Sequence, residues 1–493
     1  MMLAQLLAGI ATPPRDVGVS DITLDSRHVR RGAVFLACRG ERQHGLDFIE
    51  QVVSKGAAAV LWEPAGDRRA PELSSDIVVT RVPQLLEHAS EIAARFFGDP
   101  SRSLAVTGIT GTNGKTTTAW LLAQALSACG RPAAYLGTLG AAFAGAADPG
   151  VHTTPDAVTL QRRLAQFQQQ GAGAVALEVS SHALQQGRVA AVAFDSAVFT
   201  NLTRDHLDYH GSMENYGRAK VRLLETPALR LRVINADDDF GAALLLRPEF
   251  ADSIAISSAA QFAPTTGQRY IHAQSLTLGS DGVAFTIAGS FGTARLQAPL
   301  IGRFNVDNLL AVLAVLVGSG ISLPQAVTVL EGAKAPPGRM ESFGGGELPL
   351  VAVDYAHTPD ALDKALRAVR AHCTGRLLCV FGCGGDRDRG KRPQMGRVAA
   401  ELADSVILTD DNPRSESPAT ITDEIRGGMG GSGATVIHDR AKAIATALAQ
   451  ATAGDAVLVA GKGHETQQQV GAEYRPFRDQ DAVRAALQRQ VMQ

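Results

Sequence analysis

The sequence predicts an α/β protein of three domains: a smaller N-terminal α/β domain (residues 1–100), a central phosphate-loop domain with a mostly parallel sheet (101–336) and a C-terminal Rossmann-like domain (337–493). A glycine-rich turn joins an apolar strand to a helix near residue 110, and the last third repeats strand-then-helix units. The Gly/Pro-rich stretches 98–100 and 335–338 mark the two boundaries. A length of 493 residues suits three domains.

The N-terminal hundred residues alternate short apolar strands with helical segments. The predicted strands are Ala33–Ala37 and Ala58–Trp62, and the predicted helices are Leu46–Lys55 and Gln84–Phe97. The second helix ends in Gly98-Asp99-Pro100, which stops a helix and suits a linker.

The central segment opens on the most informative stretch, Ile109-Thr110-Gly111-Thr112-Asn113-Gly114-Lys115-Thr116-Thr117. It follows the strand Leu104–Val106 and precedes a helix that ends at Gly130. Backbone N–H groups of such a turn and the helix N-terminus attract phosphate, the lysine reaches the terminal phosphates and the next hydroxyl can bind Mg²⁺. The generic pattern wants a glycine at position 109, so the form is shifted. We therefore expect a phosphate-loop ATPase domain that binds ATP or GTP.

Further elements of the central segment follow from periodicity. Thr154 is predicted as a helix N-cap with Pro155 in the first helical position, and Gly171 closes that helix. Ala174–Leu177 and Ala197–Phe199 are predicted as buried parallel strands. Residues 255–300 alternate like exposed antiparallel strands, and Leu309–Val317 is predicted as part of a core helix.

In the last third, each predicted strand runs straight into a polar cluster. The strands are Leu350–Val353, Leu377–Phe381, Ser405–Leu408 and Ala456–Val459. Since ligands of doubly wound sheets bind at the carboxyl ends of strands, the chemistry is expected in those clusters.

Composition excludes several other classes of function. A net charge of −2 gives no reason to expect binding to nucleic acid or to a membrane surface. Five cysteines without a C-x-x-C pair argue against disulfides and a zinc site and suit a reducing cytoplasm. The N-terminus has no signal-peptide pattern, and the longest apolar run is too short to span a bilayer.

Two predicted strand ends in the central segment carry metal-type ligands. Glu178 follows one strand and is the best candidate to hold Mg²⁺ near the terminal phosphates, although a capping carboxylate is an alternative. His206 follows the next strand and could assist a second ion. Because Mg²⁺ prefers oxygen ligands, a structural histidine remains an alternative for His206.

Taken together, these motifs resemble the Mur ligase family, ATP-dependent enzymes that extend the peptidoglycan stem peptide. Seven motifs match in order and cover nearly the whole chain: Thr110–Thr116, Glu178–His182, Asn201–Gly211, Gly302–Asn308, Gly338–Glu341, Asp354–Pro359 and Gly461–Glu465. Within the family, Asp411-Asn412-Pro413-Arg414 resembles the members that add meso-diaminopimelate to UDP-N-acetylmuramoyl-L-alanyl-D-glutamate. Members that use lysine resemble this motif up to the proline and lack the arginine.

The chemistry of the amino acid agrees with that resemblance. Meso-diaminopimelate is lysine with an extra carboxylate, and the Arg414 guanidinium can grip a carboxylate with two parallel hydrogen bonds. Pro413 fixes the backbone that aims Arg414. The alternative is an arginine in a surface turn, and the sequence does not prove that lysine is excluded.

The resemblance also implies a role for each matching residue. The amino acid would meet Arg387, Asp411, Asn412, Pro413, Arg414, Gly461 and Glu465. The nucleotide would meet Gly111, Thr112, Asn113, Gly114, Lys115, Thr116, Thr117, Asn305, Arg339, Asp354 and His357. The UDP-muramoyl dipeptide would meet Leu24, Ser26, His152, Thr153, Thr154, Ser180, Gln186 and Arg188. The family's next uridine-binding stretch falls near Glu41-Arg42-Gln43, whose residues differ from the usual ones.

Lys220 stands apart, because by composition it is a lysine on a helix surface. The resemblance implies that it carries a carbamate formed with CO₂, which would join Thr116, Glu178 and His206 as a metal ligand. Carbamate formation needs a neutral amine, so burial or nearby positive charge must lower its pKa.

The implied reaction forms an acyl phosphate from the substrate carboxylate and ATP, which the amine of diaminopimelate then attacks, with Lys115, Glu178, His206 and Lys220 as the catalytic group. The residue that takes the proton of the amine is left open. We expect a cytoplasmic monomer with small-molecule substrates, ATP and Mg²⁺. The rivals are a folylpolyglutamate synthase, a ligase that recycles murein tripeptide, a phosphate-loop switch or motor, and a non-catalytic relative.

Overall fold

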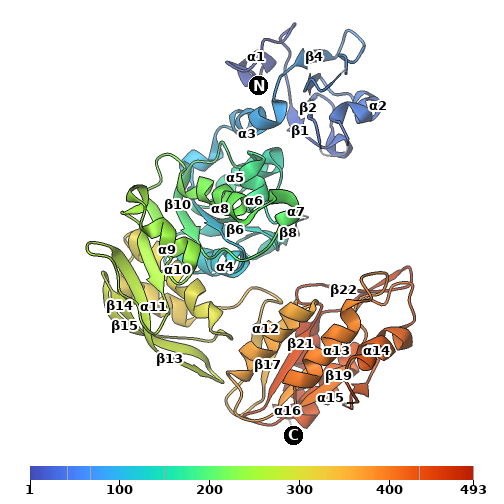
Figure 1. Cartoon of the computed structure of the whole chain (residues 1–493). Coiled ribbons are helices and arrows are strands. Elements are labelled where there is room, and N and C mark those ends of the chain that lie inside the picture. The colour runs from blue at the N-terminus through green and yellow to red at the C-terminus, as the bar shows by residue number, and fades with distance from the viewer. Residues whose placement is uncertain (41–42, 67, 149, 151, 432, 492–493) are drawn as a thin grey trace. The chain divides into compact units, whose positions relative to one another are not determined.

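The computed structural model describes residues 1–493 except 41–42, 67, 149, 151, 432 and 492–493. Two compact units divide the chain, Met1–Ile254 and Ala255–Gln493. The predicted α/β class is confirmed, with an N-terminal parallel sheet, a central mixed sheet and a C-terminal sheet (Figure 1). Within the described ranges, no helix combines the length and the apolar character needed to cross a bilayer. The boundaries at residues 100 and 336 stay a prediction.

The N-terminal sheet has four parallel strands in the order β1-β2-β3-β4. The strands are β1 (Asp21–Thr23), β2 (Ala33–Ala37), β3 (Ala59–Trp62) and β4 (Val78–Arg81). The helices are α1 (Leu3–Leu6), α2 (Ile49–Ser54) and α3 (Leu85–Phe96), with 3₁₀ turns η1 (Ser26–His28), η2 (Gly45–Phe48) and η3 (Pro100–Ser103). Side chains of α1 and α3 pack on one face and those of α2 on the other, which buries β2 and β3 completely. The helix predicted over 46–55 is therefore a 3₁₀ turn followed by a short α-helix.

The central sheet of the first unit runs β11-β10-β5-β9-β6-β7-β8, parallel except at the β6-β7-β8 edge. Its strands are β5 (Ala105–Thr110), β6 (Ala133–Gly137), β7 (Gly140–Phe143), β8 (Ala146–Asp148), β9 (Ala174–Glu178), β10 (Phe194–Phe199) and β11 (Leu231–Asn235), and β12 (Ile254–Ser257) follows at the end of the unit. Its helices are α4 (Lys115–Ala128), α5 (Ala157–Gln169), α6 (Ser181–Gln185), α7 (Leu207–His210), α8 (Met213–Leu224) and α9 (Asp239–Leu245), with the 3₁₀ turn η4 (Pro248–Phe250).

Both faces of this sheet are covered. Leu136 and Leu177 share a core with residues of α5 and α8, whereas the neighbouring Tyr135 points to the opposite face and packs against Trp120 of α4. Alternate residues of a strand point to opposite faces. The buried parallel strands predicted at 174–177 and 197–199 are thus confirmed.

The start of α5 differs from the prediction. Asp156, not Thr154, is the N-cap, because its carboxylate accepts hydrogen bonds from the backbone N–H groups of Val158 and Thr159, both at 3.0 Å. Thr154 is buried, and its hydroxyl donates to the carbonyl of Glu178 at 2.8 Å. The prediction was wrong because a carboxylate two residues further along offers the helix two acceptor bonds.

The second unit begins with antiparallel strands, as predicted for 255–300. They are β13 (Arg269–Gly279), β14 (Gly282–Gly289) and β15 (Gly292–Ala298). The helices α10 (Phe304–Gly318) and α11 (Leu323–Glu331) follow. Every residue of α10 from Asn308 to Val317 is buried, which confirms the predicted core helix.

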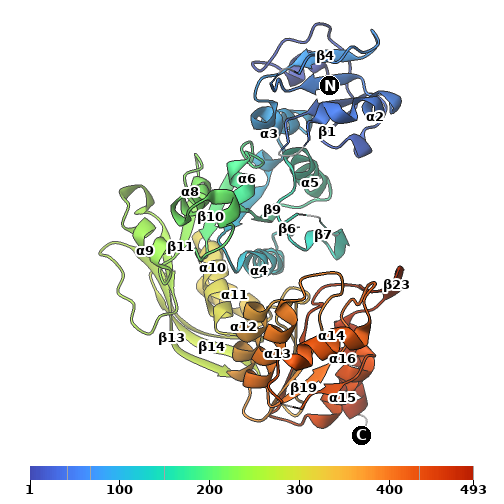
Figure 2. The same cartoon turned by 45° about the vertical axis from the view of Figure 1, so that its right-hand side comes forward.

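The C-terminal sheet has the order β16-β17-β21-β18-β19-β20, and only β16 is antiparallel. Its strands are β16 (Glu341–Gly344), β17 (Leu350–Asp354), β18 (Leu377–Phe381), β19 (Ser405–Leu408), β20 (Thr435–Val436) and β21 (Ala456–Ala460), and a separate hairpin pairs β22 (Gln467–Val470) with β23 (Glu473–Pro476). Its helices are α12 (Pro359–Arg370), α13 (Lys391–Leu402), α14 (Pro418–Gly427), α15 (Arg440–Gln450) and α16 (Asp479–Val491). Helices α12, α13 and α14 share one core with the sheet and α15 and α16 another, the doubly wound arrangement that the sequence predicts (Figure 2).

Candidate active site

The phosphate loop lies between β5 and α4, as the sequence predicts. Gly111 and Gly114 have φ values of +151° and +84°, and a Cβ at Gly111 would lie 1.8 Å from the hydroxyl oxygen of Thr200. Only glycine fits such a position. Lys115 curls back over the loop, and its Nζ donates to the carbonyls of Gly111 and Thr112, both at 2.9 Å.

The segment after β10 braces this loop from the side. The backbone N–H of Asn113 donates to the side-chain oxygen of Asn201 at 2.9 Å, and that of Thr112 donates to the carbonyl of Asn201 at 2.8 Å. The hydroxyl of Thr112 lies 3.2 Å from that of Tyr216. Asn201 and Tyr216 carry no predicted site role, and their only signal in the sequence is their place in or near the motif that follows β10.

Glu178 ends β9 and is completely buried. Its carboxylate accepts hydrogen bonds from the hydroxyls of Thr116 (2.9 Å), Tyr135 and Thr138 (3.1 Å), and from the backbone N–H of Thr138 (2.9 Å). A Cβ at Gly137 would lie 2.1 Å from the carboxylate, so this approach needs glycine. Thr116 and Glu178 therefore form a pair of oxygen ligands beside the phosphate loop, which is the donor chemistry that Mg²⁺ prefers.

His206 does not join this pair. It follows β10 with a φ of +51° and belongs to a ring cluster, with its centroid 4.8 Å from that of His182 and 6.1 Å from that of Tyr216. Among the described residues, no group of three or more His, Cys, Asp or Glu side chains is arranged to hold a metal ion. The role of His206 as a ligand of a second ion stays a prediction.

Lys220 is buried, whereas composition alone predicts a lysine on a helix surface. It lies on α8 with 1% of its surface exposed, and its Nζ donates to the carbonyl of Gly111 at 2.7 Å and stands 4.4 Å from the ring centroid of Tyr216. Burial, followed by the nearby Lys115 cation, lowers the pKa of the Lys220 amine to about 6. The amine is therefore largely neutral near pH 7, as carbamate formation requires.

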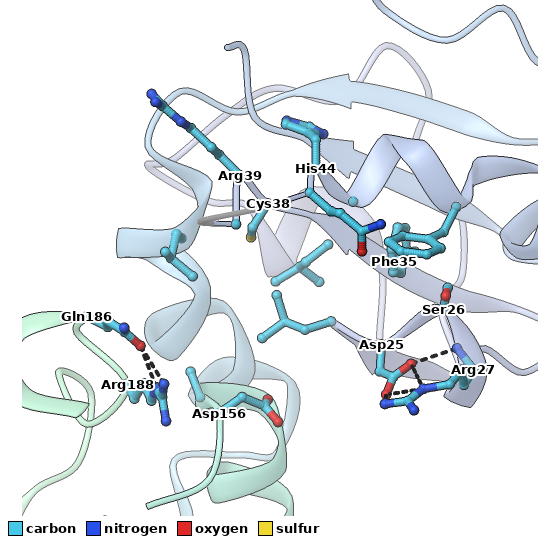
Figure 3. Close-up of a pocket in the computed structure, with 18 of the residues that line it drawn as sticks. Asp25, Ser26, Arg27, Phe35, Cys38, Arg39, His44, Asp156, Gln186 and Arg188 are labelled. Atoms are coloured by element: carbon cyan, nitrogen blue, oxygen red, sulfur yellow. Dashed lines mark hydrogen bonds and ion pairs between the residues drawn. The ribbon is translucent and has the colours of Figure 1, made fainter. Parts of the chain in front are cut away.

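A cavity of about 1280 Å³ in the first unit gathers most of the residues predicted to bind the UDP-muramoyl substrate (Figure 3). Leu24, Ser26, His152, Gln186 and Arg188 all line it. Figure 3 shows Asp25, Ser26 and Arg27, in and next to the turn η1 of the N-terminal segment, on one side of this cavity and Gln186 and Arg188, which follow α6, on another. Of the predicted uridine-binding stretch Glu41-Arg42-Gln43, Gln43 lines the cavity. Glu41 and Arg42 lie outside the described residues.

Three other residues predicted for this substrate connect the cavity to Glu178. The hydroxyl of Thr138 donates to that of Thr153 at 3.1 Å, and the N–H of Ser180 donates to the hydroxyl of Thr154 at 3.0 Å. Arg188 is held by Gln186 and by the carbonyl of Thr154 at 3.0 Å. Gln186 and Arg188 of the cavity are thus connected through Thr154 to Glu178 within the first unit.

In the second unit, the predicted amino-acid residues meet at the carboxyl edge of the C-terminal sheet. Asn412, after β19, donates to the carboxylate of Glu465, after β21, at 2.8 Å. Lys462 is fully buried and donates to both side chains, at 3.1 and 2.8 Å. Burial opposes ionisation of Glu465, but the hydrogen bond and charge of Lys462 and the hydrogen bond of Asn412 together outweigh it and lower the pKa of that carboxyl. Lys462 belongs to the motif Gly461–Glu465, but it carried no predicted role, because its burial and its bond to the distant Asn412 do not show in the sequence.

Arg414 and Arg387 flank one turn. A Cβ built on Gly384 would lie 2.9 Å from Nη1 of Arg414 and 3.8 Å from Cγ of Arg387, and Nη1 of Arg414 donates to the carbonyl of Gly385 at 2.7 Å. Arg387 is exposed. Asp411 and Pro413 are buried, and burial raises the pKa of the Asp411 carboxyl. Gly461 packs against Asp411, because a Cβ there would lie 2.5 Å from the carboxylate.

The residues predicted at the nucleotide in this unit gather around Tyr355. The Arg339 guanidinium carbon lies 5.1 Å from its ring centroid, and the ring of His357 4.5 Å. Asp354 accepts a hydrogen bond from the N–H of Met340 at 2.8 Å, and burial raises the pKa of its carboxyl. Asn305 is buried in the first turn of α10 and donates to the carbonyl of Ile301 at 2.8 Å.

Comparison with known families agrees with the arrangement of these sites. Residues 19–97 match the family described as "Mur ligase family, catalytic domain", residues 109–316 the Mur ligase middle domain, and residues 338–463 the Mur ligase glutamate ligase domain.

Individual relatives cover nearly the whole chain. A UDP-N-acetylmuramoyl-L-alanyl-D-glutamate–2,6-diaminopimelate ligase of Pseudomonas aeruginosa is 48% identical over 474 residues, 96% of each chain. A protein of the same name from Xanthomonas oryzae pv. oryzae is 48% identical and covers 100% of this chain and 98% of its own. A solved structure of an enzyme of that name has a TM-score of 0.72 at 36% identity and covers 96% of this chain and 95% of its own. A folylpolyglutamate synthase of Mycobacterium tuberculosis shares the fold at a TM-score of 0.57 and 17% identity, covering 76% of this chain and 92% of its own.

Proposed function

The chain belongs to the Mur ligase family, and from this premise we propose that it adds meso-diaminopimelate to UDP-N-acetylmuramoyl-L-alanyl-D-glutamate with the hydrolysis of ATP to ADP and phosphate. The reaction extends the peptide of a peptidoglycan precursor. Relatives of that name at 48% identity over nearly the full length support it. The observation that carries the choice of amino acid is Arg414, whose guanidinium lies against the same glycine turn as Arg387.

The domains divide the substrates in this proposal. Residues 1–100 bind the uridine end, 101–336 bind ATP and 337–493 bind the amino acid. The cavity lined by Ser26 and Arg188 joins the first two of these within one unit. Its hydrogen-bonded connection to Glu178 supports a route from the muramoyl peptide to the terminal phosphate.

In the first step, the free carboxylate of the dipeptide attacks the terminal phosphate of ATP, which gives an acyl phosphate and ADP. Two anions meet here, so the Lys115 ammonium and the N-terminus of α4 offset their charge. The hydroxyl of Thr116 and the carboxylate of Glu178 would hold Mg²⁺, which neutralises phosphate charge when bound. The proposed second ligand group, His206 and modified Lys220, is supported only by family resemblance and by the low pKa of the Lys220 amine.

Modification of Lys220 follows from its neutral amine. The nitrogen forms a bond to the carbon of CO₂ and releases one proton, which leaves a carbamate anion. Burial beside Lys115 supports the reaction, because it lowers the pKa of the amine before modification and places a cation near the anion afterwards.

In the second step, the amine of diaminopimelate attacks the acyl phosphate carbon, phosphate leaves and the amide bond forms. Arg387 holds one carboxylate, Arg414 holds the carboxylate at the far end, and Gly461 and Glu465 orient the amino groups. Asp354, His357, Arg339 and Asn305 complete the nucleotide site in this proposal. The acceptor of the amine proton remains unassigned.

We place this chemistry in the cytoplasm. The five cysteines are unpaired in the structure, which suits a reducing compartment. In this proposal the protein acts as a monomer.

The decisive experiment incubates the purified protein with ATP, the UDP-muramoyl dipeptide and either diaminopimelate or lysine, and determines the product by mass spectrometry. A tripeptide product with diaminopimelate is expected. Lys115→Ala should abolish ADP release that depends on both substrates. ADP release at full rate without any amino acid would favour a switch or motor instead.

A further inference from the structure

The two loops that carry Arg387 and Arg414 are hydrogen-bonded to each other at the carboxyl edge of the C-terminal sheet. The N–H of Gly385 donates to the carbonyl of Asn412 at 2.9 Å, and the Arg414 guanidinium returns a bond to the carbonyl of Gly385 at 2.7 Å. The loop after β18 and the loop after β19 therefore form one structure, and a shift of either one moves both guanidinium groups.

Side chains also join the loop after β18 to the loop after β19. The hydroxyl of Ser415 donates to the carboxylate of Asp386 at 2.7 Å, and the N–H of Asp386 donates to the carboxylate of Glu416 at 2.6 Å. Asp386 and Arg414 have φ values of +53° and +51°. Residues with a Cβ adopt this left-handed conformation reluctantly, so surrounding contacts must hold it.

Arg392 lies beneath both loops and supplies such a contact. It belongs to the first turn of α13 and is fully buried. Its Nη1 and Nη2 each donate to one oxygen of Glu416 at 2.9 Å, and Nη2 also donates to the carbonyl of Gly384 at 3.1 Å. One guanidinium thus grips the Arg414 loop through Glu416 and the Arg387 loop through Gly384.

Arg392 and Glu416 both stay charged. Hydrogen bonding to Arg392 lowers the pKa of the Glu416 carboxyl to about 2. Nη1 of Arg392 donates as well to Glu424 on α14 at 2.7 Å, so the guanidinium is anchored to a helix of the scaffold. A planar guanidinium fork can serve these three acceptors together, whereas a lysine ammonium cannot match that geometry.

We propose that Arg392 is a positioning residue for amino-acid selection: through Glu416 and Gly384 it fixes the separation of the Arg387 and Arg414 guanidinium groups to suit a diamino acid with two carboxylates. This inference rests on the proposed function of the same site. It adds that selection depends on a residue that does not touch the substrate.

The test compares Arg392→Lys with Arg389→Gln. Lysine keeps a positive charge opposite Glu416 but loses the fork. Arg389 is an exposed residue at the end of the loop after β18. Its side chain pairs with Glu424, the carboxylate that Arg392 also binds, and in the described contacts it makes no hydrogen bond or ion pair to Glu416 or Gly384. It is therefore a matched control. For each protein, KM is measured for diaminopimelate, ATP and the UDP-muramoyl dipeptide, together with the ratio of kcat/KM for diaminopimelate and lysine.

We expect Arg392→Lys to raise KM for diaminopimelate about tenfold and to lower the preference over lysine, because a small misplacement of a binding group is costly. KM for the other two substrates should stay within about twofold of the unsubstituted protein's values. Arg389→Gln should match the unsubstituted protein. A wild-type KM and preference in Arg392→Lys would overturn the inference, and so would an equal loss towards all three substrates, the mark of a merely structural residue.

Glu416→Gln gives a second route if Arg392→Lys fails to fold. It keeps an acceptor for the N–H of Asp386 and weakens only the charged fork, so it should reproduce the rise in KM for diaminopimelate. An unchanged KM would overturn the inference. If the unsubstituted protein itself makes no diaminopimelate product, the proposed function fails; a normal product with unchanged variants rejects only the role of Arg392.

Discussion

Lys220 and Arg392 are both basic side chains with 1% exposure or less, yet their surroundings differ completely. Lys220 meets a backbone carbonyl and a tyrosine ring, and the charge of Lys115 acts on it as well. Arg392 meets the carboxylates of Glu416 and Glu424. Burial lowers the pKa of the lysine amine to about 6, whereas the hydrogen bond to Glu416 raises the pKa of the arginine further.

The contrast shows two ways to bury a base. An uncompensated base gives up its proton, and a compensated one stays charged and fixes its neighbours. At the phosphate loop the first solution leaves a neutral amine that can react. At the amino-acid site the second holds two loops in place. Reactivity and rigidity thus follow from whether a carboxylate accompanies the buried nitrogen.

The largest effect that tests this comparison concerns Lys220. Replacing it by methionine keeps the volume and removes the amine, and we expect product formation to fall by roughly 100- to 1000-fold, the range for losing one charge-stabilising group. Arg218→Gln on the same helix, exposed and paired only with Glu214 among the described ion pairs, should leave the rate unchanged. Product formation is followed by mass spectrometry.

A second measurement on Lys220 uses pH. Because the folded pKa is about 6 against an ordinary 10.5, the amine is mainly neutral above pH 6 and becomes protonated below it. Incorporation of labelled bicarbonate into Lys220 should therefore decline as the pH falls through 6. Labelling that rises on acidification, or that persists in Lys220→Met, would contradict the assignment.

Arg414→Ala tests the loops that Arg392 holds, and its expected effect is smaller than that of Lys220→Met. A bidentate, charge-assisted grip is worth roughly 2–3 kcal/mol, so kcat/KM for diaminopimelate should fall about 30- to 150-fold while lysine use changes little. Arg397→Ala, an exposed arginine on α13, serves as control. Equal losses with both amino acids would rule out a carboxylate grip.

The sequence reaches the groups that do chemistry more readily than the groups that hold them. The phosphate loop, the strand ends and the mostly parallel direction of the strands were all predictable, because glycine turns, apolar runs and polar clusters are local signals. The family resemblance predicted a low pKa for the Lys220 amine. The burial of Lys220 could not be predicted, because by composition it is a lysine on a helix surface.

Supporting contacts were missed because they join distant segments. Tyr135 and Thr138 bind Glu178 across about forty residues, and Arg392 binds Glu416 across 24. No periodicity reports such pairs. The error at Thr154 has the same origin, since its hydroxyl is bonded to the carbonyl of Glu178 on a separate strand.

The smallest predicted effect concerns His372. This buried base has no carboxylate partner among the described contacts and no proposed catalytic role. Its Nδ1 lies 2.7 Å from the carbonyl of Gly279, and its Nε2 accepts the N–H of Gly302 at 2.9 Å, so the neutral tautomer with hydrogen on Nδ1 fits both partners. Burial lowers the pKa of this imidazole below 6.5, against the opposing effect of the backbone bonds. The unfolded chain thus binds more protons between the folded pKa and 6.5.

It follows that the contribution of His372 to the free energy of unfolding is fully present above about pH 6.5. This contribution is lost as the pH falls towards the folded pKa, at ~1.4 kcal/mol for each unit of pKa shift. Hydrogen exchange of the Gly302 amide should accelerate on acidification over this range, after correction for the intrinsic rate. His372→Gln, which does not titrate, should remove that dependence, whereas His28→Gln at an exposed ion pair should not. An acid-induced loss of protection that persists in His372→Gln would mean that the imidazole is not the group that responds.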